Sequence, residues 1–385
     1  MDAPRPLRLT SAAEATARLG IGRGSLYSYV SRGLIRSFAS PGDPRERLYS
    51  VDDVEALIRR RVRLRRPTVA AATALDWGLP VLETSLTRVE AGRLFYRGED
   101  AVRLAQTATL EDVALLLIPG LGANAFEVAP PRAGRSARAP FLDAAIQALS
   151  RARIDESAGI DRTVPAILRL MTAAAGAGAD RRPVHEALAA AWGLDAAGTE
   201  AVRQALVLCA DHELSSSAFA VRVAASTGAA LKEAVIAGLA TLSGPRHGGA
   251  TDRVRALLEA AETPQGWRAV KARLEAGEPP IAFDHHLYPD GDPRAAALLA
   301  ALPKGSALAR RDRSRVRLIA EATGRKPSLD VGLVALERAH RLPRGAAFAI
   351  FAIGRTVGWL AHAVEQRAQG GLIRPRARYV APTSA

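Results

Sequence analysis

Apolar residues recur at helical spacing through most of the chain, and this pattern predicts a mainly α-helical protein. The predicted helical segments are 104–117, 141–153, 164–177, 183–192, 199–210, 217–242, 252–262 and 351–366. Residues 82–98 break the pattern and predict a short β-hairpin or extended stretch. Residues 67–74 predict a linker, and residues 119–138, rich in Gly, Pro, Ala and Arg, predict a surface loop.

The residues before this linker form a separate small module in the pattern. Ser11-Ala-Ala-Glu14 is a capping box, which predicts that a helix begins there. The elements predicted for the module are a helix to about residue 19, a second helix at 23–30, two short strands within 38–49 and a third helix capped at 50–53 that ends in the basic run 59–66.

The composition of the chain limits the classes of protein to which it can belong. The chain has 385 residues, 48% of them hydrophobic, which is enough for two or three domains. Its net charge of +14 favours anionic partners, nucleic acid or small carboxylates and nucleotides, without choosing between them. Cys209 is the only cysteine, which excludes an internal disulfide and a cysteine-based metal site. No signal peptide or apolar membrane span stands out, so we expect a soluble, cytoplasmic protein without membrane contact.

Two phrases in the first module resemble the MerR/excisionase type of DNA-binding domain. They are Gly24-Ser-Leu-Tyr-Ser-Tyr-Val-Ser-Arg-Gly-Leu-Ile35 and Arg47-Leu-Tyr-Ser-Val-Asp-Asp-Val54. The resemblance implies a winged helix-turn-helix domain over residues 1–66, with its second helix in the major groove and its wing on the backbone. The residues implied to face DNA are Arg23, Ser25, Tyr27, Ser28 and Arg32, with Arg45 and Arg47 on the wing. The alternative is a helical module that packs on its neighbour and binds nothing.

One histidine, His247, lies in a Gly-rich turn between two predicted helices, Ser243-Gly-Pro-Arg-His-Gly-Gly-Ala250. The two glycines after the imidazole allow a ligand to approach the backbone. A helix N-terminus disfavours the imidazolium form, so a neutral ring can donate a hydrogen bond to a carbonyl oxygen that gains charge. On this stretch alone, a turn whose histidine caps a helix is the favoured explanation.

Further candidate residues follow in order along the chain. They are His212, His285, Arg294, Asp330, Arg355 and Arg374. Arg355, Trp359 and His362 share one face of the helix predicted at 351–366. No histidine pair has the spacing of a helical zinc site, and no phosphate loop or nucleophile elbow is present, so we expect no metal.

Five motifs, in family order, resemble the citrate synthase family from about residue 82 to 382. The nearly literal ones are Ala-Asp-His-Glu-Leu at 210–214, Gly-Pro-Arg-His-Gly-Gly-Ala at 244–250, Asp-Pro-Arg-Ala at 292–295 and Gly-Arg-Thr-Val-Gly-Trp-Leu-Ala-His-Ala-Val-Glu-Gln at 354–366. The resemblance implies an all-helical fold of two domains. The large domain would comprise residues 67–249 and 344–385, and the small domain residues 250–343.

The activity that this resemblance implies is condensation of acetyl-CoA or propionyl-CoA with oxaloacetate, followed by thioester hydrolysis, without a cofactor or metal. Asp330 would take a proton from the acyl methyl group, His247 would hydrogen-bond the thioester oxygen, and His285 would polarise the ketone. The residues implied to hold the oxaloacetate carboxylates are His212, Arg294, Arg355 and Arg374. Arg374 would come from the other subunit of a homodimer.

Departures from the family pattern affect the thioester half of this site. Ala282 and Asp284 stand where the family usually has glycines against the CoA, and Pro289 replaces a position that is often basic. The alternative function is a DNA-binding transcriptional regulator, in which the helix-turn-helix binds operator DNA and the synthase-like body is a dimeric sensor of oxaloacetate or citrate. We favour the enzyme because the acid and base residues are all present, and a sensor does not need Asp330.

Overall fold

A computed structural model describes residues 9–31, 34–40, 47–55, 57–58, 81–127, 140–178, 182–377 and 379. The chain divides into two compact units, Met1–Glu83 and Thr84–Ala385. The finer division of the second unit into a large and a small domain stays a prediction.

The first unit combines short helices with a small antiparallel sheet. Its elements are β1 (Leu9–Thr10), α1 (Ala12–Leu19), α2 (Arg23–Ser31), β2 (Ser37–Ala39) and β3 (Arg47–Ser50), followed by helical residues 51–55 and 57–58. The strand order is β1-β3-β2, and Leu26 of α2 is buried against Ile35 and Tyr49. The predicted order of elements is thus present, whereas the assignment as a MerR-like domain stays a prediction.

The predicted capping box at the start of α1 is only half present. The Ser11 Oγ accepts the Glu14 amide at 3.2 Å, but the Glu14 carboxylate accepts the Thr10 hydroxyl at 2.7 Å. The side chain of Glu14 is therefore engaged by the strand before the helix.

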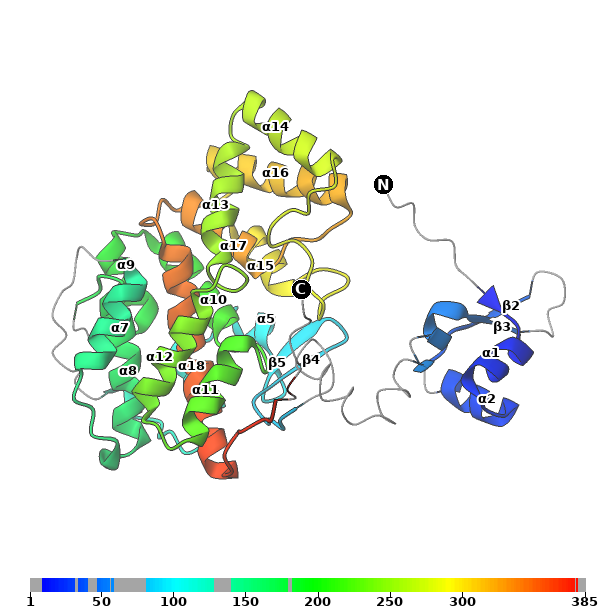
Figure 1. Cartoon of the computed structure of the whole chain (residues 1–385). Helices are drawn as coiled ribbons and strands as arrows, with labels where there is room; N and C mark the ends of the chain where they lie inside the picture. The colour runs from blue at the N-terminus through cyan, green and yellow to red at the C-terminus, as the bar shows by residue number, and fades with distance from the viewer. Residues whose placement is uncertain are drawn as a thin grey trace. The chain divides into compact units, whose positions relative to one another are not determined.

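The second unit is mainly helical and carries one small sheet (Figure 1). Its elements are β4 (Thr87–Glu90), β5 (Arg93–Tyr96), β6 (Glu99–Asp100), α5 (Ala101–Leu104), α6 (Leu110–Leu117), η1 (Ala125–Glu127), α7 (Phe141–Arg151), η2 (Glu156–Ala158), α8 (Ile160–Ala174), α9 (Val184–Trp192), α10 (Ala196–Cys209), α11 (Ser216–Ser226), α12 (Leu231–Leu242), α13 (Ala250–Ala260), α14 (Pro264–Glu275), α15 (Pro293–Ala301), α16 (Ala307–Thr323), α17 (Leu329–Ala339) and α18 (Ala346–Gln369). The predicted hairpin is β4–β5, which turns through Ala91 and Gly92, both with positive φ as a two-residue hairpin turn requires.

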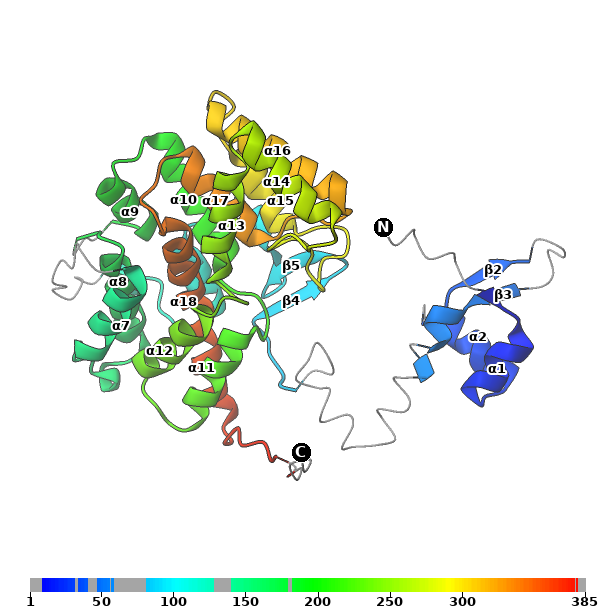
Figure 2. The same ribbon diagram turned by 45° about the horizontal axis from the view of Figure 1, so that its top comes forward.

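Helix α18 runs through the middle of this unit and packs on α10, α11, α12 and α17 (Figures 1 and 2). It is apolar enough to pass as a membrane span by composition, but 89% of its apolar window is buried, as in a core helix. Gly354 and Gly358 allow close packing, because a Cβ on either would overlap the end of α10 or the turn after it. Trp359 is fully buried in the core.

Two predicted helices are each divided in the structure. The segment 217–242 forms α11 and α12, because Gly228 takes a left-handed φ of 83° and ends the first helix. The segment 104–117 contains the end of α5 and all of α6, which begins at a capping box of Thr109 and Asp112. The helical period continues across both breaks in the sequence, so the apolar pattern did not reveal them.

Helices α13 to α17 lie together at one end of the unit (Figures 1 and 2). The turn at 243–250 leads into α13, and the segments at 282–294 and 326–330 lead into α15 and α17. Five candidate residues are therefore on the connections into these helices, in the first turns of α15 and α17, or in the turn between α10 and α11: His247, His285, Arg294, Asp330 and His212. Arg355 lies within α18, and Arg374 follows it.

Candidate active site

Three aromatic side chains from two segments form the centre of the candidate site. The rings of His212 and His285 meet edge to face with centroids 5.0 Å apart, and Tyr288 lies 5.6 Å and 5.1 Å from them. The His212 Nε2 is 2.9 Å from the Tyr288 hydroxyl. Burial, and then the charge of Arg294, hold the pKa of His212 well below its usual value, so this imidazole is neutral.

His285 is held by its own segment. The Leu287 amide donates to its Nδ1 at 3.2 Å, which leaves the proton of a neutral ring on Nε2. Burial, and then the charge of Arg294, lower the pKa of His285 to about 4. At neutral pH this side chain is therefore a hydrogen-bond donor without a charge.

His247 lies in the turn that leads into α13. Its Nε2 is 2.9 Å from the Ser217 hydroxyl on α11, and its ring packs edge to face on Phe351 of α18 at 5.9 Å. Gly249 is required here, since a Cβ would overlap the carbonyl oxygen of Ser243. Burial, and then the charge of Arg355, lower the pKa of His247 to about 4, so His247 is the third uncharged imidazole of the site, after His212 and His285.

Asp330 occupies the first turn of α17. One carboxylate oxygen, Oδ2, is 3.4 Å from the Ser328 hydroxyl, and the other, Oδ1, is buried without a hydrogen-bond partner among the described residues. Burial raises the pKa of Asp330 to about 6, although the charge of Arg294 opposes the shift. A carboxylate with such a pKa and an unsatisfied oxygen is suited to accept a proton near neutral pH.

Two buried arginines supply the positive charge of the site. Arg294 donates through Nε and Nη2 to the two oxygens of Asp292, at 3.0 and 2.8 Å, and its guanidinium lies over the Tyr288 ring. Arg355 on α18 donates to the Cys209 carbonyl at 2.9 Å and to the Ser215 hydroxyl at 3.3 Å. In the described part of the chain no carboxylate forms an ion pair with Arg355, so its charge is open to an anionic ligand.

Arg374 does not join this group within one chain. It is exposed on the extended segment after α18, which is tied to α11 by a hydrogen bond from the Ile373 amide to the Ser226 hydroxyl at 3.1 Å. The structure thus assembles six of the seven predicted enzyme-site residues around the turn at 210–215, through the contacts and charges described above. The role of Arg374 across a dimer stays a prediction.

Sequence reasoning missed several residues that hold the candidates in place. They are Ser217, Tyr288 and Asp292. The role of Asp292 as a helix cap could have been predicted, because Asp is a common N-cap and Pro is common at the first helical position. In the structure Asp292 caps α15 in this way. Its carboxylate also accepts the Leu329 amide at 3.0 Å, which connects Arg294 to the start of the helix of Asp330.

Ala282 and Asp284 both keep a left-handed backbone, with φ of 59° and 75°. This conformation favours glycine and costs other residues about 1–2 kcal/mol. Backbone hydrogen bonds hold it, from Asp284 to Lys326 at 2.7 Å and from Ser328 to Ala282 at 2.9 Å. The Asp284 carboxylate also pairs with Arg325 at 3.0 Å. The segment before His285 therefore has the backbone conformation that glycines would favour, and it is hydrogen-bonded to the segment that leads to Asp330.

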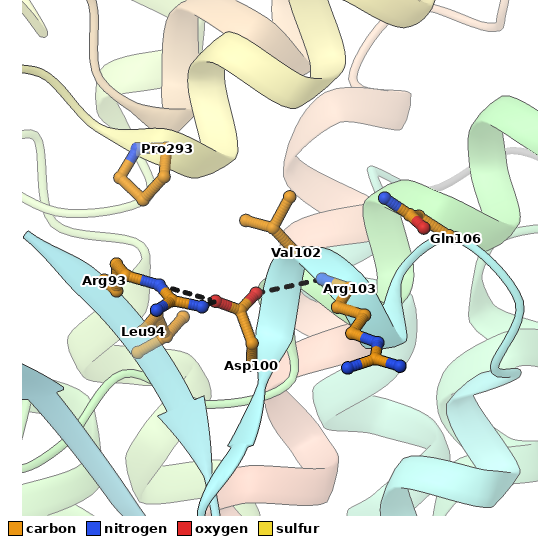
Figure 3. A pocket seen from close by; sticks show the side chains of 7 residues that line it. All are labelled: Arg93, Leu94, Asp100, Val102, Arg103, Gln106 and Pro293. Atoms are coloured by element: carbon orange, nitrogen blue, oxygen red, sulfur yellow. Dashed lines mark hydrogen bonds and ion pairs between the residues drawn. The ribbon is translucent and has the colours of Figure 1, made fainter.

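A surface pocket of about 450 Å³ lies beside this site, at the sheet (Figure 3). It is lined by Arg93, Leu94, Asp100, Val102, Arg103, Gln106 and Pro293. None of the candidate catalytic residues lines it. In the parts of the chain that the structure describes, no group of three or more His, Cys, Asp or Glu side chains could hold a metal ion.

The candidate DNA-binding residues of the first unit lie mostly on an exposed surface. Arg23, Ser25 and Tyr27 are exposed on α2, Ser28 is half-buried, and Arg47 is exposed at the start of β3. Arg32 and Arg45, together with the basic run 59–66, lie outside the described residues.

Comparison with known proteins agrees with the fold and the motifs. Residues 158–376 match the family model "Citrate synthase, C-terminal domain", which is more than half of the chain. Citrate synthase 2 of Bacillus subtilis is 34% identical over 190 residues, which cover 48% of this chain and 51% of that protein. The 2-methylcitrate synthase of Shewanella oneidensis is 33% identical over 189 residues, covering 47% and 50%.

The solved structures show the same fold at lower identity. A ternary complex of citrate synthase from Thermoplasma acidophilum with carboxymethyl coenzyme A and oxaloacetate has a TM-score of 0.65 at 22% identity, covering 82% of this chain and 97% of that one. Citrate synthase from Thermotoga maritima has a TM-score of 0.64 at 24% identity, covering 80% and 95%. The chain belongs to the citrate synthase family. Its sequence matches span about half the length of the curated relatives.

The raised pKa of Asp330 predicts a pH-dependent stability. Because the folded protein holds this proton up to a higher pH than the unfolded chain, the group destabilises the fold increasingly as pH rises from about 4 to 6. Asp330→Asn removes that cost, so we expect the variant to be more stable than the wild type by up to about 3 kcal/mol at pH 7 and equally stable at pH 4. Urea unfolding at both pH values measures this, and a stability difference that does not change with pH contradicts it.

Proposed function

We propose that the chain is a citrate synthase-type acyltransferase that condenses acetyl-CoA or propionyl-CoA with oxaloacetate. The observation that carries the proposal is the chemical state of the site, in which a carboxylate with a pKa of about 6 accompanies two neutral imidazoles and two buried arginines. Enolisation of a thioester needs a base of this kind together with an uncharged hydrogen-bond donor for the carbonyl oxygen. The family uses acyl-CoA as a substrate and needs no metal cofactor.

In the proposed reaction, Asp330 takes a proton from the methyl or methylene carbon next to the thioester. Its Oδ1, which has no hydrogen-bond partner among the described residues, is the oxygen that accepts the proton. In the tautomer that the reaction requires, the Ser217 hydroxyl donates to His247 Nε2, 2.9 Å away, and Nδ1–H donates to the thioester oxygen as it becomes an enol oxygen. The neutral state of His247 avoids transfer of a full proton before the carbon reacts.

The enol carbon then attacks the ketone carbon of oxaloacetate, and the new carbon–carbon bond leaves charge on the ketone oxygen. His285 donates Nε2–H to this oxygen, in the tautomer that the Leu287 amide selects. Arg294, Arg355 and His212 hold the two carboxylates, with Arg374 of a second copy of the chain in a homodimer. Water then attacks the thioester carbonyl, the carbon–sulfur bond breaks, and CoA leaves as the thiol.

Closure of one domain over the other is part of the proposed mechanism. Residues 250–343 would act as a small domain that closes over the substrates and excludes water until condensation is complete. The hydrogen bonds between 282–284 and 326–328 support this, because they would move His285 and Asp330 together as one body.

Release of CoA from acetyl-CoA or propionyl-CoA with oxaloacetate tests the proposal, monitored through the free thiol. We expect Asp330→Asn and His247→Ala each to lower kcat by about 10²-fold or more, because each removes a group that acts where charge develops. Asp290→Asn, which changes an exposed carboxylate on the segment after His285, is the matched control and should retain activity. A folded wild-type protein without turnover at millimolar substrate would count against the enzyme.

A second function rests on the exposed surface of α2. Tyr27 is 56% exposed, which is unusual for a large aromatic side chain, and Arg23 precedes it by one helical turn. We infer that this surface binds duplex DNA, which would make the synthase-like body the sensor of a transcriptional regulator. The two functions are compatible in one chain.

Retention of mixed-sequence duplex DNA by the full chain, measured across a salt series, tests the second function. Replacing Arg23 and Tyr27 by Ala should weaken binding and lower the salt slope by about one, as expected for one lost phosphate contact. Arg18→Ala is a control in the same unit, because Arg18 lies on α1 and pairs with Glu55. No retention at low salt, or equal retention by both variants, would exclude α2 as the binding surface.

A further inference from the structure

A buried contact between an aspartate and a histidine lies directly behind the candidate site. Asp211 and His362 are both fully buried, with Oδ1 and Nε2 3.4 Å apart. By geometry the contact is not a hydrogen bond, and among the described residues neither carboxylate oxygen and neither ring nitrogen has another hydrogen-bond partner. The Thr87 hydroxyl lies near the Asp211 carboxylate and helps to lower its pKa. Groups of this kind are costly to bury, so the pair needs a physical explanation.

The contact between Asp211 and His362 is the third in a series of contacts between α18 and the end of α10. Arg355 donates to the Cys209 carbonyl, the Gly358 amide donates to the Ala210 carbonyl at 2.9 Å, and His362 faces Asp211. Three consecutive residues at the end of α10 are thus held by residues of α18 that share one face. The next residue along the chain is His212.

The backbone of Asp211 is held as well. The hydroxyl of Tyr96, which is buried, lies 3.3 Å from the Asp211 carbonyl oxygen and 3.4 Å from its amide. Beyond His212 the chain turns through Glu213 with a left-handed φ of 53°. The position of the His212 imidazole is therefore set by the short segment 209–213, which the contact between Asp211 and His362 holds against α18.

The charge of Asp211 also acts on the arginine of the site. Burial lowers the pKa of Arg355, and the nearby Asp211 carboxylate is the largest effect that opposes this shift. Burial acts to raise the pKa of Asp211, and interaction with His362 is the largest effect that lowers it. Asp211 therefore contributes negative charge behind a guanidinium that has no carboxylate ion pair of its own among the described residues.

We propose that Asp211 and His362 are positioning residues that hold His212 and Arg355 in the geometry that binds the keto acid. They act from behind the site and touch no substrate, and this inference rests on the proposed function of the site. A purely structural pair would stabilise the fold without affecting affinity for the ligand.

The test compares variants of this pair with the same change in another buried pair. Asp211→Asn removes the charge at constant size, and His362→Leu removes the ring nitrogens, whereas His362→Gln keeps a donor near the position of Nε2. The matched control is Asp312→Asn, because Asp312 pairs with Arg338 at 2.7 Å between α16 and α17 and both are buried. Each variant is made in the full chain and assayed for thermal stability and for oxaloacetate binding by calorimetry.

We expect Asp211→Asn and His362→Leu to raise the Kd for oxaloacetate about tenfold, because small misplacements of binding groups are costly. His362→Gln should restore most of the affinity. Asp312→Asn should lower the melting temperature by a similar amount and leave the Kd within about twofold. If the pair variants lose stability but bind oxaloacetate like the wild type, the inference is overturned. Where His362→Leu does not fold, Asp211→Asn and His362→Gln decide the question.

A second measurement separates this inference from the proposed function. If the wild-type chain binds no oxaloacetate, the proposed function fails. The imidazole NMR signals of His212, assigned by their loss in His212→Gln, then test whether Asp211 and His362 position this ring. Movement of these signals in Asp211→Asn but not in Asp312→Asn supports positioning. Unchanged signals in both variants overturn it.

Discussion

The site depends on two buried guanidinium groups that lie beside one buried and two half-buried imidazoles. Arg294 and Arg355 are each almost fully buried, and their charges act on His212, His247, His285 and Asp330. Burial disfavours protonation of the histidines, and the neighbouring positive charges disfavour it further. The imidazoles are therefore neutral donors at neutral pH, while the same burial makes Asp330 a stronger base.

The fold maintains this state by connecting the charged groups to rigid elements. Arg355 is anchored on α18, the core helix of the unit, and Arg294 lies in the first turn of α15 with Asp292 as its bidentate partner. Asp292 also accepts the first amide of α17, so the charge on Arg294 and the base Asp330 are fixed relative to each other. The imidazoles lie on short connections between helices, where Ser217, Leu287 and Tyr288 select their orientation.

Much of the helical architecture could be predicted from the sequence, because apolar periodicity reports directly on buried helix faces. Gly249 and Gly358 lie in motifs that contain candidate residues, so the sequence indicated that the backbone is closely approached there. In the structure the approaching atoms are the carbonyl oxygens of Ser243 and Ala210. The division at Gly228 was not, because the apolar pattern continues across it. The partners of the candidate residues were harder to find, because Ser217 and Tyr288 are distant in sequence from His247 and His212 and have no motif of their own. At Ala282 and Asp284 the sequence lacks glycine and yet the backbone stays left-handed, since hydrogen bonds to 326 and 328 determine it.

The central claim is that the site holds uncharged imidazoles because they are buried beside positive charge. A pH titration of the histidine ring signals by NMR in the full chain, assigned with single His→Gln variants, tests it most directly. The account predicts that His247 and His285 titrate at about pH 4 and that His212 stays neutral to still lower pH. Titration of these three histidines near their ordinary value of about 6.5 would contradict it.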